Sequence, residues 1–183
     1  MERPNFGKVV AAVRNTEEFA AALNSNVNVI FDLSPDILIL SKKVKSAHEA
    51  GKKIFIHIDL ANGIGKDESG IKFAKAIGVD GIISTRVNIV RLARENDVFA
   101  VQRFFAVDSQ SIDTTISAIK SAKPDMIEIM PGILYKVVKN LCDKTDIPII
   151  AGGFIDSVDE INSVLECGAS AVSTGKKELW GIK

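Results

Sequence analysis

Short apolar runs rich in β-branched residues recur along the whole chain, and a stretch with helical periodicity follows each of them. Most runs are apolar on both faces, which is typical of strands that helices cover or that close into a barrel. Eight such units in 183 residues average about 23 residues each, the size of a minimal strand–helix repeat. The eight runs span 8–13, 27–33, 53–60, 81–84, 98–104, 126–130, 147–151 and 170–174.

Residues that begin and end helices fall between these runs. Ser34 and Pro35 predict an N-cap followed by proline at the first helical position. Ser157 and Glu160, three residues apart, have the spacing of a capping box, and Gly168 is placed to end the helix that they begin. These residues therefore agree with a chain in which strands alternate with helices.

A weak internal repeat supports the same organisation: a helix end, a glycine or proline, and an apolar strand that ends in a polar residue. It occurs at 74–84, 119–129 and 164–174. We predict an α/β protein, a compact (β/α)8 TIM-type barrel that forms a single domain over residues 1–183. A doubly wound open sheet is the alternative, but its glycine-rich turn would follow the first strand, where Arg14, Asn15 and Thr16 stand.

Charge and composition exclude several classes of protein. Lysine plus arginine and aspartate plus glutamate both number 23, so a globally basic nucleic-acid-binding protein is excluded and such a partner needs a local patch. No apolar run approaches the roughly 18 residues of a membrane span, and residues 1–10 do not resemble a signal peptide. Cys142 and Cys167 form no CxxC pair. We therefore expect a cytoplasmic protein with no membrane partner.

Ionisable residues stand near the ends of several predicted strands, where the loops of such a barrel form a site. His57 and Asp59 are two apart and would share the inner face of a strand, while Arg103 and Glu128 occupy similar positions on two others. An unpaired buried charge costs several kcal/mol, so we expect these side chains to pair with each other or with a ligand. Each taken singly also fits an ordinary satisfied interior residue.

Glycines and hydroxyl residues follow the last two strands, where many barrels hold a phosphate. Glycine lets main-chain N–H groups approach an anion closely, and a short helix at 176–180 would add its positive N-terminus. The alternative is that these glycines only serve tight turns. The predicted phosphate-binding residues are Gly152, Gly153, Ser173, Thr174 and Gly175.

Catalytic and metal chemistry find little support in the residues. His57, Asp59 and Glu128 are the one combination resembling a metal cluster, and the second histidine, His48, falls on a predicted surface helix. Serine and cysteine nucleophiles have no base partner other than His57. We therefore expect no metal, no cofactor and no catalytic residues.

Several long stretches together carry a family resemblance. They are GKKIFIHIDLANGIGKDESGIKF from Gly51, DGIISTRVNIVRLAR from Asp80, VQRFFAVDS from Val101, PDMIEIMPGI from Pro124, IPIIAGGFI from Ile147 and GASAVSTGKKELW from Gly168. With these motifs in this order, the chain resembles the glycerol-3-phosphate-responsive antiterminator family, also called glycerol uptake operon antiterminator regulatory proteins. The resemblance covers nearly the whole chain.

The resemblance implies a regulator of transcription antitermination rather than an enzyme. Such proteins bind glycerol 3-phosphate as effector and act on the leader mRNA of glycerol-utilisation genes. The five glycine and hydroxyl residues after the last two strands would then hold the phosphate. The side chains that would order the glycerol hydroxyls are His57, Asp59, Arg103 and Glu128, with Arg103 also within reach of the phosphate.

The RNA-binding residues are less visible, since basic residues occur in small clusters that also suit an ordinary solvated surface. The predicted RNA-binding residues are Lys136, Lys139, Lys176 and Lys177; other clusters are Lys42, Lys43 and Lys45, and Arg86, Arg91 and Arg94. An enzyme acting on a small phosphorylated sugar or polyol is the alternative function, with Asp59 or Glu128 as acid or base. The sequence does not decide between a monomer and a homo-oligomer.

Overall fold

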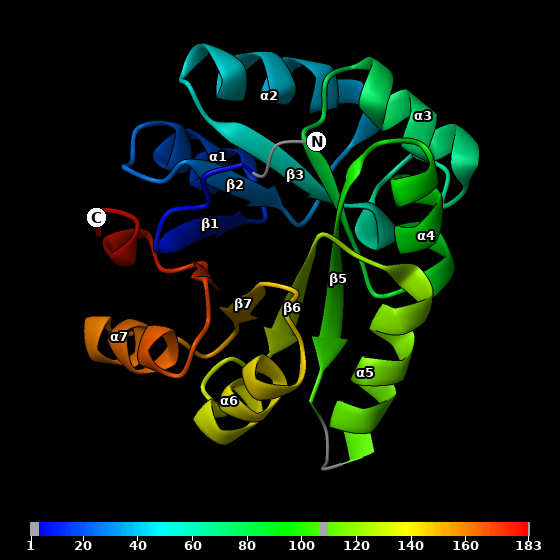
Figure 1. Ribbon diagram of the computed structural model, residues 1–183. Coiled ribbons are helices and arrows are strands. Elements are labelled where there is room, and N and C mark those ends of the chain that lie inside the picture. The colour runs from blue at the N-terminus through cyan, green and yellow to red at the C-terminus, as the bar shows by residue number, and fades with distance from the viewer. Residues whose placement is uncertain (1–3, 107–109, 183) are drawn as a thin grey trace.

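The computed structural model describes residues 4–106 and 110–182 and shows a closed barrel of parallel strands (Figure 1). Each strand pairs with the next along the chain, and β8 (Ala171–Thr174) pairs in parallel with β1 (Val9–Val13). The predicted (β/α)8 barrel is confirmed, and the open doubly wound sheet is excluded because β1 and β8 close the ring.

Helices follow the first seven strands and lie around the outside of the barrel (Figure 1). The remaining strands are β2 (Val29–Asp32), β3 (Lys53–His57), β4 (Gly81–Ser84), β5 (Phe99–Phe105), β6 (Met126–Met130) and β7 (Ile149–Gly152). The helices are α1 (Thr16–Leu23), α2 (Ile37–Glu49), α3 (Glu68–Ala76), α4 (Val87–Glu95), α5 (Gln110–Ala122), α6 (Tyr135–Lys144) and α7 (Val158–Glu166). Two 3-10 turns complete the fold, η1 (Ile58–Leu60) and η2 (Lys177–Leu179).

Alternation along the strands separates two apolar cores. On β3, Ile54 and Ile56 point outward and belong to the large cluster between the barrel and its helices. Phe55, between them, points inward and belongs to the smaller cluster that fills the barrel. Apolar residues on both faces of one strand are what produced the continuous apolar runs in the sequence.

Phenylalanine rings fill the N-terminal half of the barrel. Phe6, which precedes β1, packs its ring centroid 5.3 Å from that of Phe55 and 5.9 Å from that of Phe99. Gly81 is needed beside them, because a Cβ there would lie 2.2 Å from the Phe55 ring. The barrel interior at this end is therefore apolar.

The helix boundaries agree with the sequence prediction in one place and differ from it in another. The Ser157–Glu160 capping box is confirmed at the start of α7, and Gly168 follows that helix with a φ of 103°. The predicted cap of α2 is wrong: Asp36, not Ser34, accepts from the Leu38 N–H at 2.9 Å. The reason is that residues 35–37 first pair with Asn62, which delays the helix.

Two predicted segments are shorter than expected. The run 53–60 leaves the strand at His57, because Ile58–Leu60 coil into the turn η1. The short helix expected over 176–180 is only the three-residue turn η2, after which Trp180 is buried. No anion site at a helix N-terminus can therefore be assigned to this segment.

Candidate functional site

An ion pair lies inside the C-terminal end of the barrel, which we call the mouth. Arg103 of β5 and Glu128 of β6 are register partners, and Arg103 Nε donates to Glu128 Oε2 at 2.6 Å. Glu128 is only 1% exposed. The expectation that the strand-end charges pair is confirmed for these two residues. Glu128 lies between the outward-facing Ile127 and Ile129, and Arg103 has the parity of the inward-facing Val101, so both belong to the inner face.

The second oxygen of Glu128 is also occupied. Ser173 Oγ donates to Glu128 Oε1 at 2.6 Å, which links β6 to β8 across β7. Between them stands Gly152, where a Cβ would lie 2.4 Å from Ser173 Oγ and 2.9 Å from Glu128 Oε1. Gly152 therefore makes room for this network, a function that differs from the predicted phosphate contact.

His57 is 4% exposed, and its Nδ1 is buried without a hydrogen-bond partner among the described residues. Burial lowers the pKa of His57, and the positive charge of Arg103 lowers it further against the opposing charges of Asp59 and Glu128. His57 therefore lies within electrostatic range of the other three residues predicted to contact the ligand, Asp59, Arg103 and Glu128. The neutral imidazole is the form that this environment favours.

Asp59 has a structural role that the strand prediction missed. It lies on η1 rather than on a strand, so the shared face with His57 is wrong. Its carboxylate accepts from Ser84 Oγ at 2.7 Å and from the Thr85 N–H at 2.8 Å. Burial acts to raise the pKa of Asp59, but the hydrogen bonds from Thr85 and Ser84 outweigh it and leave the pKa below its ordinary value.

A cavity of about 260 Å³ opens at the mouth between the ends of β1, β5, β6, β7 and β8. Six of the nine predicted effector-binding residues line it, whereas Gly152, His57 and Asp59 do not. The lining residues are Ala12, Arg14, Leu33, Arg103, Glu128, Met130, Gly153, Phe154, Ile155, Asp156, Ser173, Thr174, Gly175 and Lys176.

Hydrogen-bond donors dominate one side of this cavity. The main-chain N–H groups of Gly153, Phe154, Ile155 and Gly175 donate to no protein acceptor among residues 4–106 and 110–182. Phe154 and Gly175 are exposed and Gly153 is half-buried, so these N–H groups are open to solvent, and a set of N–H groups around a cavity suits an anion. This arrangement is the one expected for the predicted phosphate site.

Three cationic side chains join these N–H groups. The guanidinium of Arg14 has no carboxylate partner within the described part of the chain, and Lys176 Nζ lies 3.6 Å from Asp156 Oδ1. Among the described residues, Arg103 bonds Glu128 through Nε, and no bond from its terminal nitrogens is seen there. Sequence reasoning missed Arg14, although Val10, Ala12 and Arg14 alternate inward and the position could have been found from that.

The two hydroxyl groups predicted to hold the phosphate already donate to oxygen atoms of the protein. Thr174 Oγ1 donates to the Ile155 carbonyl at 3.0 Å and accepts from the Lys176 N–H at 3.2 Å. It therefore ties the loop after β8 to the loop after β7. Since the Ser173 proton goes to Glu128, both hydroxyls shape the cavity and offer a ligand only their lone pairs.

Phe154 combines an unusual backbone with an unusual exposure. Its φ is 58°, a left-handed conformation that costs a bulky residue about 1–3 kcal/mol. Its side chain is 75% exposed although it lines the cavity. The preceding Gly153 has a φ of 80°, and a Cβ on it would lie 3.0 Å from Met130 Cε.

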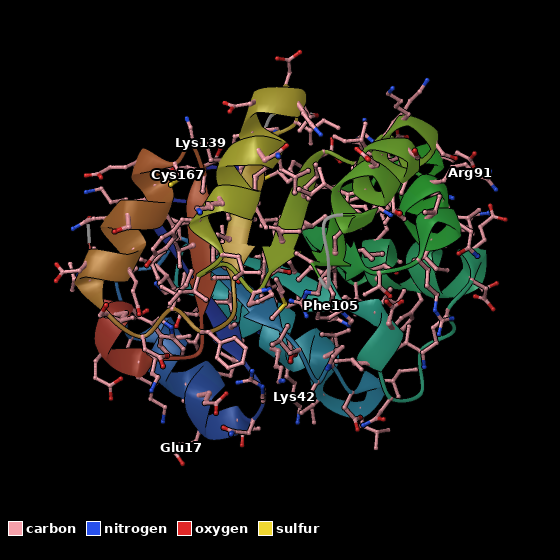
Figure 2. The ribbon with its side chains drawn as sticks, turned by 90° about the horizontal axis from the view of Figure 1, so that it is seen from below. Glu17, Lys42, Arg91, Phe105, Lys139 and Cys167 are labelled. Carbon is pink, nitrogen blue, oxygen red and sulfur yellow. The ribbon has the colours of Figure 1, made fainter. Side chains whose placement is uncertain are left out.

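Exposed large apolar side chains surround the mouth, and we call them the apolar rim. Every such residue described lies at a strand end, in the loop that follows, or in the first turn of the next helix. Figure 2 places one of them, Phe105, near the middle of its view. The rim consists of Ile37, Leu38, Ile39, Leu60, Phe105, Leu134, Phe154 and Val158.

The residues predicted to bind RNA come from two segments, α6 and the segment that follows β8. Lys136 and Lys139 are exposed on α6, whereas Lys176 lines the cavity. Lys177 Nζ donates to Glu17 Oε1 at 2.6 Å, a bond that raises the pKa of Lys177.

The other basic clusters are dispersed too. Lys43 is buried and bonded to Asp32 at 2.7 Å, and Arg94 pairs with Asp125. Figure 2 shows Lys42, Arg91 and Lys139 on three different sides of the molecule. These three residues therefore do not share one patch.

Two absences hold for the part of the chain that the structure describes. No group of three or more His, Cys, Asp or Glu side chains is placed to hold a metal ion. No helix there is both long and apolar enough to span a membrane.

Residues 9–180 match the family model described as glycerol-3-phosphate responsive antiterminator. The chain belongs to this family. A solved relative is the glycerol uptake operon antiterminator regulatory protein from Listeria monocytogenes str. 4b F2365. It is 34% identical, the match covers 100% of both chains, and the TM-score is 0.93.

Two further relatives extend the comparison. A glycerol uptake operon antiterminator-related protein from Thermotoga maritima MSB8 is 32% identical, with 96% of this chain and 99% of that chain covered and a TM-score of 0.86. The uncharacterized protein YgcP of Escherichia coli (strain K12) is 35% identical over 175 residues, 95% of this chain and 92% of that protein. The two solved relatives thus share this fold over nearly the whole chain.

Proposed function

We propose that this antiterminator-family protein binds glycerol 3-phosphate in the mouth cavity and then acts on the leader mRNA of glycerol-utilisation genes, without turning its effector over. The observation that carries the effector half is the donor-lined side of the cavity, where four lining residues have main-chain N–H groups without a described acceptor and Arg14 and Lys176 line the same cavity. Phosphate recognition requires such a concentration of donors.

The charges of the cavity suit a phosphate monoester. Arg14, Arg103 and Lys176 supply three positive charges, against the negative charges of Glu128 and Asp156. Glu128 is already bonded by Arg103 and Ser173. The phosphate would therefore sit on the loops after β7 and β8, and the glycerol hydroxyls would point toward Ser173 and the Arg103–Glu128 pair.

Calorimetric titration with glycerol 3-phosphate, glycerol and inorganic phosphate tests the effector half. We expect binding of glycerol 3-phosphate, with glycerol much weaker. Arg14→Gln should weaken that binding about tenfold or more, since it removes a charge-assisted hydrogen bond. Arg91→Gln, an exposed position on α4 outside the cavity, is the matched control. Equal affinity of the wild type and Arg14→Gln for glycerol 3-phosphate would contradict this placement.

Enzymatic action on a small phosphorylated sugar or polyol is the second candidate. It is favoured by one observation, the buried neutral imidazole of His57 beside Arg103 and Glu128. Against a Schiff-base mechanism stands the fact that the one described lysine lining the cavity, Lys176, is ion-paired with Asp156. Incubation with glycerol 3-phosphate and dihydroxyacetone phosphate should return both unchanged. Product formation that Glu128→Gln abolishes would establish the enzyme instead.

Binding of leader RNA is the other half of the proposal and rests on membership of the antiterminator family. A mobility-shift assay with leader RNA, with and without glycerol 3-phosphate, tests it directly. We expect a shifted complex that the effector strengthens and that rising salt weakens, because phosphate contacts release counterions. The same low affinity with and without the effector would refute an effector-controlled RNA interaction.

A further inference from the structure

Phe154 differs from every other residue of the apolar rim. It is the one member that lines the cavity, and it is nevertheless 75% exposed. A large aromatic side chain at the lip of a polar cavity loses water contact only if a ligand or another group covers it. The free cavity therefore leaves unused apolar surface at its edge.

The backbone of Phe154 is clamped on both sides. The Gly132 N–H donates to the Gly152 carbonyl at 2.5 Å, and Thr174 Oγ1 donates to the Ile155 carbonyl at 3.0 Å. Ile155 itself is 1% exposed. The main chain is therefore held at Gly152, two residues before Phe154, and at Ile155, one residue after it. The aromatic side chain is the group that is left able to move.

The left-handed conformation at Phe154 has a consequence for the ligand. This φ favours glycine or asparagine, so an aromatic residue here gains nothing for the fold that a smaller residue would not supply. Phe154 lines the cavity, its N–H has no described acceptor, and its side chain is largely exposed. One residue is thus positioned to meet both the phosphate and the carbon chain attached to it.

We propose that Phe154 is a contact residue for the carbon skeleton of a bound phosphorylated polyol, and that its ring rotates about the Cα–Cβ bond to cover the occupied cavity while the main chain stays in place. The proposal rests on the proposed function, because the phosphate on the neighbouring N–H groups is what holds the ligand under the ring. Met130 and Leu33, which also line the cavity, supply apolar surface there.

Affinity for glycerol 3-phosphate provides the first test. Phe154→Gly keeps a residue that accepts a φ of 58° and removes the ring, so it should bind about tenfold more weakly without loss of thermal stability. Phe154→Leu should fall between the two proteins. Leu38→Ala removes another rim residue, 85% exposed and outside the cavity, and should bind as the wild type does. Equal affinity of the wild type and Phe154→Gly would overturn the proposal.

Fluorescence provides the second test, because the chain has one tryptophan and Trp180 is 1% exposed. Phe154→Trp adds an exposed indole that acrylamide should quench. Saturating glycerol 3-phosphate should protect this indole and shift its emission to shorter wavelength, whereas glycerol should do neither. An indole that stays quenchable while calorimetry shows bound effector overturns this proposal alone. Absence of effector binding to the wild-type protein overturns the proposed function, and this proposal with it.

Discussion

The Ser173 hydroxyl donates its proton to Glu128 Oε1 at 2.6 Å, so the serine near the end of β8 offers the cavity only its lone pairs. A phosphate dianion consists of acceptors and gains nothing from such a group, whereas a polyol hydroxyl has a proton to give. The cavity is therefore divided into a donor side, at Gly153 and Gly175, and an acceptor at Ser173. That division suits a molecule with a phosphate at one end and hydroxyls at the other.

Ser173→Ala tests this polarity. The variant should lose about five- to tenfold in affinity for glycerol 3-phosphate, the contribution of one neutral hydrogen bond, and little in affinity for inorganic phosphate. Calorimetry with both ligands measures the two losses on the same protein. Equal losses for both ligands would show that Ser173 contacts the phosphate and would contradict the division.

Glu128→Gln should destabilise the fold by about 3 kcal/mol, because the buried guanidinium of Arg103 would be left without a compensating charge. Urea unfolding of the two proteins at neutral pH measures the difference. Lys45→Gln is the control: it removes an exposed ion pair with Glu49, 3.8 Å long, and should change stability by less than about 0.5 kcal/mol. Similar stability losses in the two variants would mean that the Arg103–Glu128 pair does not anchor the mouth.

The barrel was predictable because its determinants are local and repeated. Each apolar run is short and apolar on both faces, and strand parity alone placed Arg103 and Glu128 inside. Parity failed at Asp59, because hydrogen bonds from Ser84 and Thr85 accompany a turn that no strand pattern reveals.

The finer chemistry of the mouth needed three-dimensional information. The sequence showed two hydroxyls, Ser173 and Thr174, in a favourable place, but not that Glu128 and the Ile155 carbonyl take their protons. It also gave no reason to single out Phe154, whose importance depends on its backbone angle and on the cavity beside it. Pairing and exposure are properties of the folded chain, and propensity does not encode them.

Gly153→Asp should weaken glycerol 3-phosphate binding by about a thousandfold, since a carboxylate about 4 Å from the phosphate at an effective dielectric of about 20 costs roughly 4 kcal/mol. Because the φ of Gly153 is 80°, any side chain there adds strain. Gly153→Asn carries the same strain without the charge and is the matched control. The ratio of the two dissociation constants isolates the electrostatic contribution, and a ratio near one would place the phosphate elsewhere.

His57 should make the protein less stable in weak acid. Burial, and then the charge of Arg103, lower its pKa in the folded state below the ordinary 6.5. The unfolded chain therefore binds a proton more readily, and the free energy of unfolding should fall as pH drops below about 6.5 and recover above it. His57→Gln should lose this component, while His48→Gln, at an exposed position of α2 where Nε2 lies 2.8 Å from Asp80 Oδ2, should keep it. The midpoints of urea unfolding at pH 5.5 and pH 7.5 measure this change in stability for each protein. The same change in the wild type, His57→Gln and His48→Gln would contradict the prediction.

The last prediction concerns the link between effector and RNA. If glycerol 3-phosphate strengthens RNA binding, linkage requires leader RNA to tighten glycerol 3-phosphate by the same factor, about 5- to 150-fold for typical couplings of about 1–3 kcal/mol. The structure changes the choice of variants: Lys176 lines the cavity and Lys177 is bonded to Glu17, so reversing either charge disturbs more than an RNA contact.

Lys136 and Lys139 are cleaner probes, because both are exposed on α6 and neither lines the cavity. Reversing both to glutamate should weaken leader-RNA binding and its salt dependence while leaving effector affinity in the absence of RNA unchanged. Reversing Lys42 and Lys45 on α2 makes the same change in net charge elsewhere on the surface, and it should leave RNA binding much less affected. Titrating the effector with and without saturating leader RNA then completes the cycle. Identical effector midpoints for the wild-type protein would show that the two ligands are not coupled. An equal loss of RNA affinity in the two charge-reversal variants would show that α6 is not the RNA-binding face.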